Sequence, residues 1–371
     1  MKKKEFLKYM LFIPALLSIG LAGCSNTIYP SSEISQTIIS VDPAKPVVTY
    51  VGLETAVYSS TAEVVNAVAD SVVEIRTESV TTRWGQQYVV SGAGSGVIVG
   101  NSDDVYYIVT NNHVIEGANE ITVTTRSGVS YEASLVATDD SEDIAVVIIS
   151  TTDVLKIAVW GDSDELQVGE DLIAIGNPLG SLGGTVTKGI LSAKGRKITI
   201  DNYQMTLLQT DTAINPGNSG GGLFNMRGQL IGIVNAKTSD EEIEGICFAI
   251  PGNKAKKCYE DLIEKGYIVG RASFDLTLST VSTSTSTIVY VSLVGEKASN
   301  NFSQYDYIYK INGTEITSVL SFNIVMNSLT PGEEVDVVVY RGKVTTSMWG
   351  GQISFEKTPT EFKVTVGQYG A

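Results

Sequence analysis

The sequence has only one histidine, His113, and three cysteines in 371 residues. A single histidine excludes a zinc site built from several histidines, and we expect neither a metal nor any other cofactor. Two of the cysteines, Cys247 and Cys258, are too few for a disulfide framework, so we expect buried thiols. Proline is sparse at nine residues, whereas glycine is frequent at 36. Together with many Val, Ile, Thr and Tyr residues, this balance favours short strands joined by tight turns.

Positive charge is also scarce. The chain has 26 Lys and Arg against 41 Asp and Glu, a formal net charge of −15. A surface of this sign repels nucleic-acid phosphates and anionic lipid head groups. We therefore expect no nucleic-acid partner and no membrane binding by charge alone. The length predicts two folded domains.

The N-terminus has the pattern of a targeting segment. The basic stretch Lys2–Lys4 precedes an apolar run, Met10–Leu21, that is too short and interrupted for a membrane-spanning helix. The run ends in Leu21-Ala22-Gly23-Cys24, which resembles the bacterial lipobox, where the chain is cut before a lipid-modified cysteine. The alternative is a plain secretory signal with an incidental cysteine.

The lipobox predicts how the chain is held. We expect residues 1–23 to be a lipoprotein signal peptide and Cys24 to carry the lipid. Residues 24–60 are rich in Ser, Thr and Pro and are predicted to be a flexible tether. The expected location is the extracytoplasmic face of a bacterial membrane, where acyl chains anchor the protein.

Apolar runs of strand length dominate the rest of the chain. From about residue 61 to 250 they are separated by Gly, Asn and Asp, which predicts an all-β barrel or sandwich. Apolar residues at helical spacing predict a helix over Asn253–Lys265, ended by Gly266. Residues 267–345 return to alternating strands, with a predicted helix at Phe322–Leu329. The remaining C-terminal residues show no informative pattern.

A glycine-rich turn presents the first candidate for chemistry. Ser219 lies in Asn215-Pro216-Gly217-Asn218-Ser219-Gly220-Gly221-Gly222, between apolar runs. Glycines allow a tight turn and a close approach by a substrate, and backbone N–H groups of such a turn can stabilise an oxyanion. Gly217 and Ser219 are the natural N–H donors, and Asn218 is a further candidate. Taken alone, the turn fits a structural hairpin equally well.

Two further residues could complete a catalytic triad. His113 follows the apolar run Tyr106–Thr110, and it must be the base if imidazole activates Ser219, because the chain has no other histidine. Asp143 opens the apolar run Ile144–Ile149, and a carboxylate at the buried start of a strand suits the role of orienting the histidine. Asp139, Asp140 and Glu142 are nearby alternatives.

These segments together resemble the HtrA/Deg family of trypsin-fold serine proteases. The similarity is carried by segments equivalent to the family's TNxHV, D(I/L)AV, (I/L)GNPxG, TVTxGI(V/L)S and QTDAxINPGNSGG. In this sequence they are Thr110–Val114, Asp143–Val146, Ile175–Gly180, Thr185–Ser192 and Gln209–Gly221. A further stretch, Gly92–Gly96, is similar to the family's GSGSG(V/F)I, and it fails the nucleotide-binding GxGxxG pattern because position 97 is Val.

The resemblance implies a mostly β fold, with a chymotrypsin-like double β-barrel followed by a PDZ-like α+β domain. It implies acyl transfer by the triad His113, Asp143 and Ser219, with oxyanion donors from Gly217, Asn218 and Ser219. It also implies a homotrimer, and the short first loop, about Ser79–Tyr88, argues against a larger cage. The implied domain bounds are 61–252 for the protease, 253–268 for a linker helix, 269–345 for the PDZ domain and 346–371 for a tail.

The specificity pocket can be placed by spacing from the nucleophile. In trypsin-fold proteases the residue six positions earlier lies at the pocket base, and here it is Ala213, with Ile231, Ile233 and Asn235 on a neighbouring strand. None of these residues is a carboxylate, so a preference for Arg or Lys is not expected. The predicted preference is a small to medium aliphatic residue before the cut.

The C-terminal part resembles a single PDZ domain. Tyr307–Ile316 is similar to the family's DxIxxINGxxI, and Gly270–Leu276 lies where GRxxLGI is usual. Asp275 replaces the usual glycine, and a carboxylate there would repel a peptide C-terminus.

The predicted function is serine endopeptidase activity on unfolded or damaged extracytoplasmic proteins, with unfolded proteins or peptides as partners. The alternative is a membrane-tethered chaperone or stress sensor that cleaves little.

Overall fold

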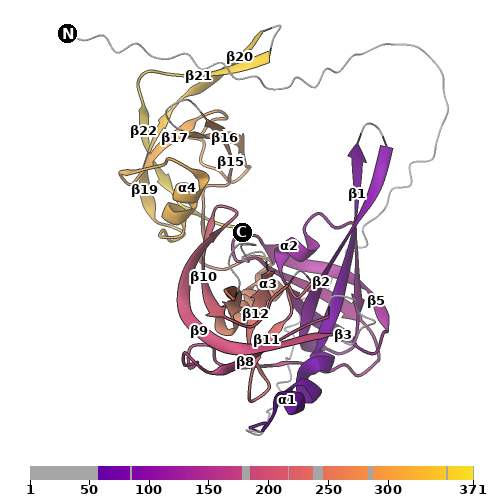
Figure 1. Cartoon of the computed structure of the whole chain (residues 1–371). Coiled ribbons are helices and arrows are strands. Elements are labelled where there is room, and N and C mark those ends of the chain that lie inside the picture. The colour runs from indigo at the N-terminus through magenta and orange to yellow at the C-terminus, as the bar shows by residue number, and fades with distance from the viewer. Residues whose placement is uncertain are drawn as a thin grey trace, which may run out of the picture. The chain divides into compact units, whose positions relative to one another are not determined.

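The computed structural model describes residues 57–83, 86–177, 184–215, 217–236, 245–282, 287–347 and 350–370. The predicted signal peptide, Cys24 and almost all of the predicted tether lie outside these residues. The chain divides into two compact units, which meet in sequence at Val269 and Gly270 (Figure 1). We call them the N-terminal and C-terminal units. No helix in the described part of the chain has the length and apolar character needed to cross a bilayer.

The N-terminal unit opens with a short helix and a closed six-stranded barrel. Helix α1 (Thr61–Val68) starts at Ser60, whose side chain accepts a hydrogen bond from the Glu63 N–H, and the 3₁₀ turn η1 (Ala69–Ser71) follows. The barrel order is β1-β2-β3-β6-β5-β4. Its strands are β1 (Val72–Arg83), β2 (Gln86–Ser102), β3 (Val105–Thr110), β4 (Glu120–Thr124), β5 (Ser130–Asp139) and β6 (Ile144–Ser150).

Strand β6 shows why some strands are apolar at every position. Ala145, Val147 and Ile149 point into the cluster inside the first barrel. Ile144, Val146 and Ile148 belong to the larger cluster shared with helix α3 and the second barrel. Because both faces are covered, the strand has no solvent-facing row and reads as a continuous apolar run.

A second ring of six strands completes the N-terminal unit. The order β11-β8-β9-β10-β13-β12 closes because β11 also pairs with β12, and β7 (Val159–Trp160) adds to β12. Two closed rings confirm the predicted double barrel. The ring strands are β8 (Asp171–Gly176), β9 (Thr185–Ile200), β10 (Tyr203–Thr210), β11 (Gly222–Asn225), β12 (Gln229–Asn235) and β13 (Cys247–Pro251).

The segment predicted as the first loop is largely strand. Strands β1 and β2 stay paired from Val72↔Val97 out to Arg83↔Gln86, so that the hairpin projects from the barrel (Figure 1). The cross-strand pair Val80 and Val89 is about half exposed or more, at 50% and 63%. Continued backbone pairing, which no loop-length argument could foresee, keeps this ribbon extended.

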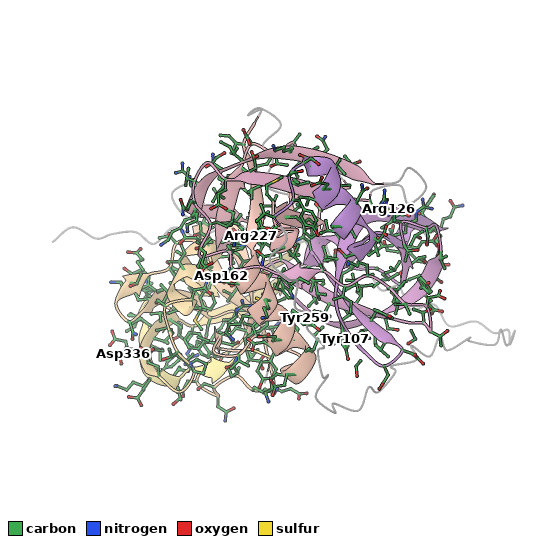
Figure 2. All side chains as sticks on the ribbon, turned by 90° about the horizontal axis from the view of Figure 1, so that it is seen from below. Tyr107, Arg126, Asp162, Arg227, Tyr259 and Asp336 are labelled. Carbon is green, nitrogen blue, oxygen red and sulfur yellow. The ribbon has the colours of Figure 1, made fainter. Side chains whose placement is uncertain are left out.

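Helix α3 (Gly252–Lys265) confirms the helix predicted here and ends at Gly266, which has a φ of +79°. Its buried side chains include Tyr259, whose ring meets Tyr107 of β3 edge-on with centroids 6.2 Å apart (Figure 2). Cys258 of α3 and Cys247 of β13 are both buried as thiols. The helix predicted as a linker is therefore packed into the core of the N-terminal unit.

The C-terminal unit is a mixed α+β fold around its own apolar core. Its main sheet has the order β15-β16-β17-β19-β22, with β18 beside β17. The elements are β14 (Ala272–Ser273), β15 (Leu276–Ser282), β16 (Thr287–Val294), β17 (Tyr307–Ile311), β18 (Thr314–Glu315), α4 (Val319–Met326), β19 (Glu334–Tyr340), β20 (Gly342–Ser347), β21 (Gly350–Phe355), β22 (Thr360–Thr365) and β23 (Gly367–Gln368).

The structure of the C-terminal unit differs from two sequence-based expectations, the start of its helix and the nature of its last residues. Helix α4 starts three residues before the predicted Phe322, because Ser318 and Ser321 form reciprocal capping hydrogen bonds. The residues predicted as a tail contain β22, which pairs with β19, and Val364 and Val366 are buried in the core. Strand β22 is only six residues long, and its pairing partner β19 lies earlier in the chain. The short segment alone therefore did not predict a strand.

Candidate active site

His113 lies on α2 (Asn112–Ile115), a single helical turn that follows β3. Its ring is fixed at both nitrogens: Nδ1 is 2.7 Å from Asp143 Oδ2, and Nε2 is 3.0 Å from Ser219 Oγ. An ionised carboxylate can only accept hydrogen bonds, so Nδ1 carries the proton and Nε2 is left to accept one from Ser219. The structure therefore brings the three predicted triad residues together in the predicted order.

Asp143 is buried, at 5% exposed, and several donors hold it. Oδ1 accepts the backbone N–H of His113 at 2.9 Å, while Oδ2 accepts both His113 Nδ1 and Asn235 Nδ2, the latter at 2.9 Å. The backbone carbonyl of Asp143 also accepts Asn111 Nδ2 at 2.9 Å. These N–H groups compensate the carboxylate for its loss of water. The alternative Asp139 instead accepts the Glu142 N–H at 2.8 Å.

Ser219 lies in a turn that only glycine permits at two positions. Gly220 has a φ of +80°, and a Cβ there would collide with the Ser95 carbonyl oxygen and the Thr110 hydroxyl. A Cβ on Gly221 would collide with the Ile175 carbonyl oxygen. The turn is thus pressed against β2, β3 and β8, which places Ser219 Oγ beside the histidine.

The predicted oxyanion donors differ in their availability. The Asn218 N–H donates to the Asn215 carbonyl at 3.0 Å, which occupies it. In the described part of the chain, the N–H groups of Gly217 and Ser219 donate to no other group. Gly217 and Ser219 are therefore the pair that a substrate oxyanion could reach, and Asn218 serves the turn itself.

The predicted lining of the specificity pocket is not assembled in the structure. Ile231 and Ile233 are fully buried in the core, because β12 is covered on both faces. Asn235 is 1% exposed and is bonded to Asp143, so it supports the triad. Of the four predicted residues, Ala213 alone is exposed to solvent.

An open cleft of about 430 Å³ is lined by Asp143 of the triad, but by neither His113 nor Ser219. One wall comes from the hairpin of β9 and β10, where the Tyr203 hydroxyl donates to Asp140 Oδ2 at 2.9 Å. The lining residues of the cleft are Asn112, Glu116, Asp140, Asp143, Ile200, Asp201, Tyr203 and Met205.

In the C-terminal unit, Asp275 adopts a φ of +54°, which explains why glycine is usual at this position. Its Oδ2 accepts the Lys297 N–H at 2.8 Å, and its carbonyl accepts the Gly295 N–H at 2.8 Å. The carboxylate is thus bonded to the chain segment that follows β16.

The sequence did not predict the supporting roles of Ser95, Asn111 and Asn235, the last of which was predicted to line the specificity pocket instead. Each is polar, lies within or at the end of an apolar strand, and is almost completely buried. That combination is visible in the sequence as a polar residue interrupting a strand pattern, but its partners are not, because they come from distant parts of the chain.

Comparison with known proteins gives two domain matches and a set of relatives. Residues 94–233 match the trypsin-like peptidase domain, and residues 275–348 match the PDZ domain. The serine protease Do-like HtrB of Bacillus subtilis is 41% identical over 278 residues, which are 68% of this chain and 60% of that protein. The serine protease Do-like HtrA of Lactococcus lactis subsp. cremoris is 38% identical over 285 residues, 70% of each chain.

Solved structures are similar over most of the chain. The HtrA-type protease AlgW with a decapeptide has a TM-score of 0.55 and 28% identity, covering 84% of this chain and 99% of that one. The serine endoprotease from Yersinia pestis has a TM-score of 0.53 and 32% identity, with coverage of 84% and 99%. In the sequence comparison, this chain matches only about 60% of the length of the Bacillus subtilis relatives.

The His–Asp–Ser geometry, the two closed barrels, the PDZ unit and these similarities agree with one another. This chain belongs to the HtrA family of trypsin-like serine proteases that carry a C-terminal PDZ domain.

Proposed function

We propose that this protein is a serine endopeptidase that cleaves unfolded or damaged extracytoplasmic proteins through an acyl-enzyme. The observation that carries the proposal is the continuous hydrogen-bonded line from Asp143 through His113 to Ser219, with distances of 2.7 Å and 3.0 Å. A hydroxyl that donates to an imidazole oriented in this way is an activated nucleophile.

The proposed reaction follows from the positions of these groups. Ser219 Oγ attacks the peptide carbonyl while its proton passes to His113 Nε2. Asp143 stabilises the resulting imidazolium, and the N–H groups of Gly217 and Ser219 stabilise the oxyanion. His113 then gives its proton to the departing amine, which leaves the acyl-enzyme. A water molecule, deprotonated by His113, attacks the acyl-enzyme; as the acyl bond breaks, His113 returns the proton to Ser219 Oγ and the enzyme is restored.

The proposed substrate preference is a small to medium aliphatic residue before the cut. It is supported by Ala213, which is exposed six positions before the nucleophile and carries no charge to attract Arg or Lys.

The proposed location is extracytoplasmic, with a lipid on Cys24 as the anchor and the protease units assembled as a homotrimer. The lipobox-like Leu21–Cys24 supports the anchor. Relatives named as periplasmic DegP-like endoproteases, for example in Chlamydia trachomatis at 38% identity, support the location.

The test compares Ser219→Ala with the wild-type protein on casein, with the fragments identified by mass spectrometry. We expect cleavage to fall by roughly four orders of magnitude or more while the fold persists. Ser134→Ala on β5 serves as a control and should retain activity. A fluorophosphonate probe should label wild type but not Ser219→Ala. An unlabelled, inactive wild type would favour the tethered chaperone or sensor instead.

A further inference from the structure

We propose that Ser95 is a positioning residue that holds the nucleophile turn, residues 217–221, in the orientation that oxyanion binding requires. Ser95 lies on β2 in the first barrel and is completely buried. It is separated from Gly217 by 122 residues, yet it contacts the turn at two points. The inference rests on the proposed function, since it assigns a role within that reaction.

Every polar group of Ser95 has a defined partner. Its N–H donates to the Ser219 carbonyl at 2.8 Å, and its carbonyl accepts the Thr110 hydroxyl at 2.7 Å. Its Oγ accepts the Asn177 N–H at 2.8 Å and lies 2.7 Å from the Gly217 carbonyl oxygen. Because a carbonyl can only accept, the single hydroxyl proton must point at Gly217. The direction of this bond is therefore set by chemistry.

These bonds fix the first and the third of three consecutive peptide planes, which join Gly217 to Asn218, Asn218 to Ser219 and Ser219 to Gly220. The carbonyl of Gly217 is held by Ser95 Oγ, and the N–H in the same plane, that of Asn218, is held by the Asn215 carbonyl. The carbonyl of Ser219 is held by the Ser95 N–H, and the N–H in that plane, that of Gly220, donates to the Val234 carbonyl at 3.0 Å. A peptide unit is planar and trans, so binding both ends prevents its rotation.

The plane between them carries the oxyanion donor. Its carbonyl, that of Asn218, accepts the Gly221 N–H at 2.9 Å inside the turn. The Ser219 N–H of the same plane points the opposite way and has no partner among the described residues. Ser95 thus anchors the two flanking planes, and the donor between them is left pointing outward.

Ser95 also joins the turn to the end of β8. The path runs from the Asn177 N–H to Ser95 Oγ and then to the Gly217 carbonyl. The site is tightly packed, because the Ser95 carbonyl lies where a Cβ on Gly220 would be. Removing the hydroxyl leaves the Asn177 N–H and the Gly217 carbonyl without this partner in a buried place.

The test compares Ser95→Ala with a matched control, Ser71→Ala. Ser71 is also completely buried, and its hydroxyl donates to the Val68 carbonyl at 2.6 Å in η1. For Ser95→Ala we expect kcat to fall by roughly 10- to 100-fold, with KM changed less than about threefold, because the turn acts on the transition state. The affinity for a peptide aldehyde, whose adduct carries the oxyanion, should fall by a similar factor. Ser71→Ala should retain kcat and aldehyde affinity.

Hydrogen–deuterium exchange supplies a readout that does not need activity. The amides of Asn218, Gly220 and Gly221, which donate hydrogen bonds in the turn, should exchange faster in Ser95→Ala and at the wild-type rate in Ser71→Ala. Wild-type kcat together with unchanged exchange would overturn the proposal for Ser95. Inactive wild-type protein would instead contradict the proposed function, and the exchange comparison would still decide the role of Ser95. If Ser95→Ala does not fold, the same measurements are made on Ser95→Cys, whose thiol is a weaker hydrogen-bond donor. Wild-type kcat and wild-type exchange in Ser95→Cys would then overturn the proposed role of Ser95.

Discussion

At the scale of single residues, the hydrogen-bonded line of Asp143, His113 and Ser219 depends on supporting side chains outside it. Asp143 has a φ of +51°, in the left-handed region that Asp tolerates better than most residues. That backbone is held by Asn111, and its carboxylate is held by His113 and Asn235. The orientation of the histidine therefore depends on Asp143 and on two other segments, residues 111–113 and the end of β12 at Asn235.

Asn235 provides the residue-scale prediction. Asn235→Ala removes one donor from the buried carboxylate, and a hydrogen bond to a charged group contributes about 1.5–3 kcal/mol. Since about 1.4 kcal/mol is tenfold in rate, we expect kcat to fall roughly 10- to 100-fold. Asn235→Asp should reduce kcat further, because it places a second carboxylate beside Asp143. Steady-state kinetics on a peptide substrate would measure both.

The control for this prediction is Asn101→Ala, at the partly exposed end of β2. It should keep wild-type kcat and a similar unfolding temperature. Full activity of Asn235→Ala would show that His113 and Asn111 hold Asp143 well enough without Asn235.

At the scale of elements, α3 and β22 are the two segments whose packing the sequence left open. Leu262 of α3 is 1% exposed in the core of the N-terminal unit. We expect Leu262→Ala to lower the free energy of unfolding of that unit by about 2–5 kcal/mol, because it removes buried methyl groups and leaves a cavity. The exposed neighbour Glu264→Ala should change it by no more than about 0.5 kcal/mol.

Urea denaturation followed by the fluorescence of Trp160, which packs against the same cluster, measures this effect. A background with Trp84→Phe and Trp349→Phe removes the other two tryptophans of the chain and makes the signal specific. Equal stability of the Leu262 and Glu264 variants would mean that α3 behaves as a detached linker.

Strand β22 gives a second element-scale prediction. A chain that stops after Phe355 lacks β22 and β23, with the buried Val364 and Val366. Strand β19 would then become an edge, and the core of the C-terminal unit would lose apolar area worth several kcal/mol, at about 1.5–3 kcal/mol for each fully buried side chain. We expect rapid digestion of residues 270–355 by added thermolysin. A chain lacking only Gly370 and Ala371 should resist digestion, and equal resistance of the two chains would refute a structural role for β22.

At the scale of the whole molecule, the first prediction concerns the anchor. If Cys24 carries a lipid, wild-type protein made in bacteria should enter the detergent phase of a Triton X-114 extraction, because buried acyl chains contribute about 0.8 kcal/mol per CH₂. Cys24→Ala should move the protein to the aqueous phase. Cys247→Ala, which leaves the signal intact, should still enter the detergent phase. Aqueous partitioning of the wild type would exclude the lipid.

Assembly is tested by light scattering coupled to size exclusion, on protein that starts after the predicted tether. The expected mass is three times that of one chain, independent of concentration in the micromolar range. A stable monomer, or a hexamer without substrate, would contradict the proposed trimer.

The apolar runs of the sequence predicted an all-β barrel or sandwich, and the resemblance of its motifs to the HtrA/Deg family implied the double barrel, the PDZ unit and the triad candidates His113, Asp143 and Ser219. These features are local: strands carry their own apolar runs, and each triad residue lies in a short motif beside a strand. Tertiary structure decided the rest. Ser95 and Asn235 act through partners more than 90 residues away, and β22 is a strand only because β19 lies beside it. Ile231 and Ile233 were predicted to line the specificity pocket, but they are completely buried because both faces of β12 are covered. Contacts between distant segments depend on how the barrels close, which no local pattern records.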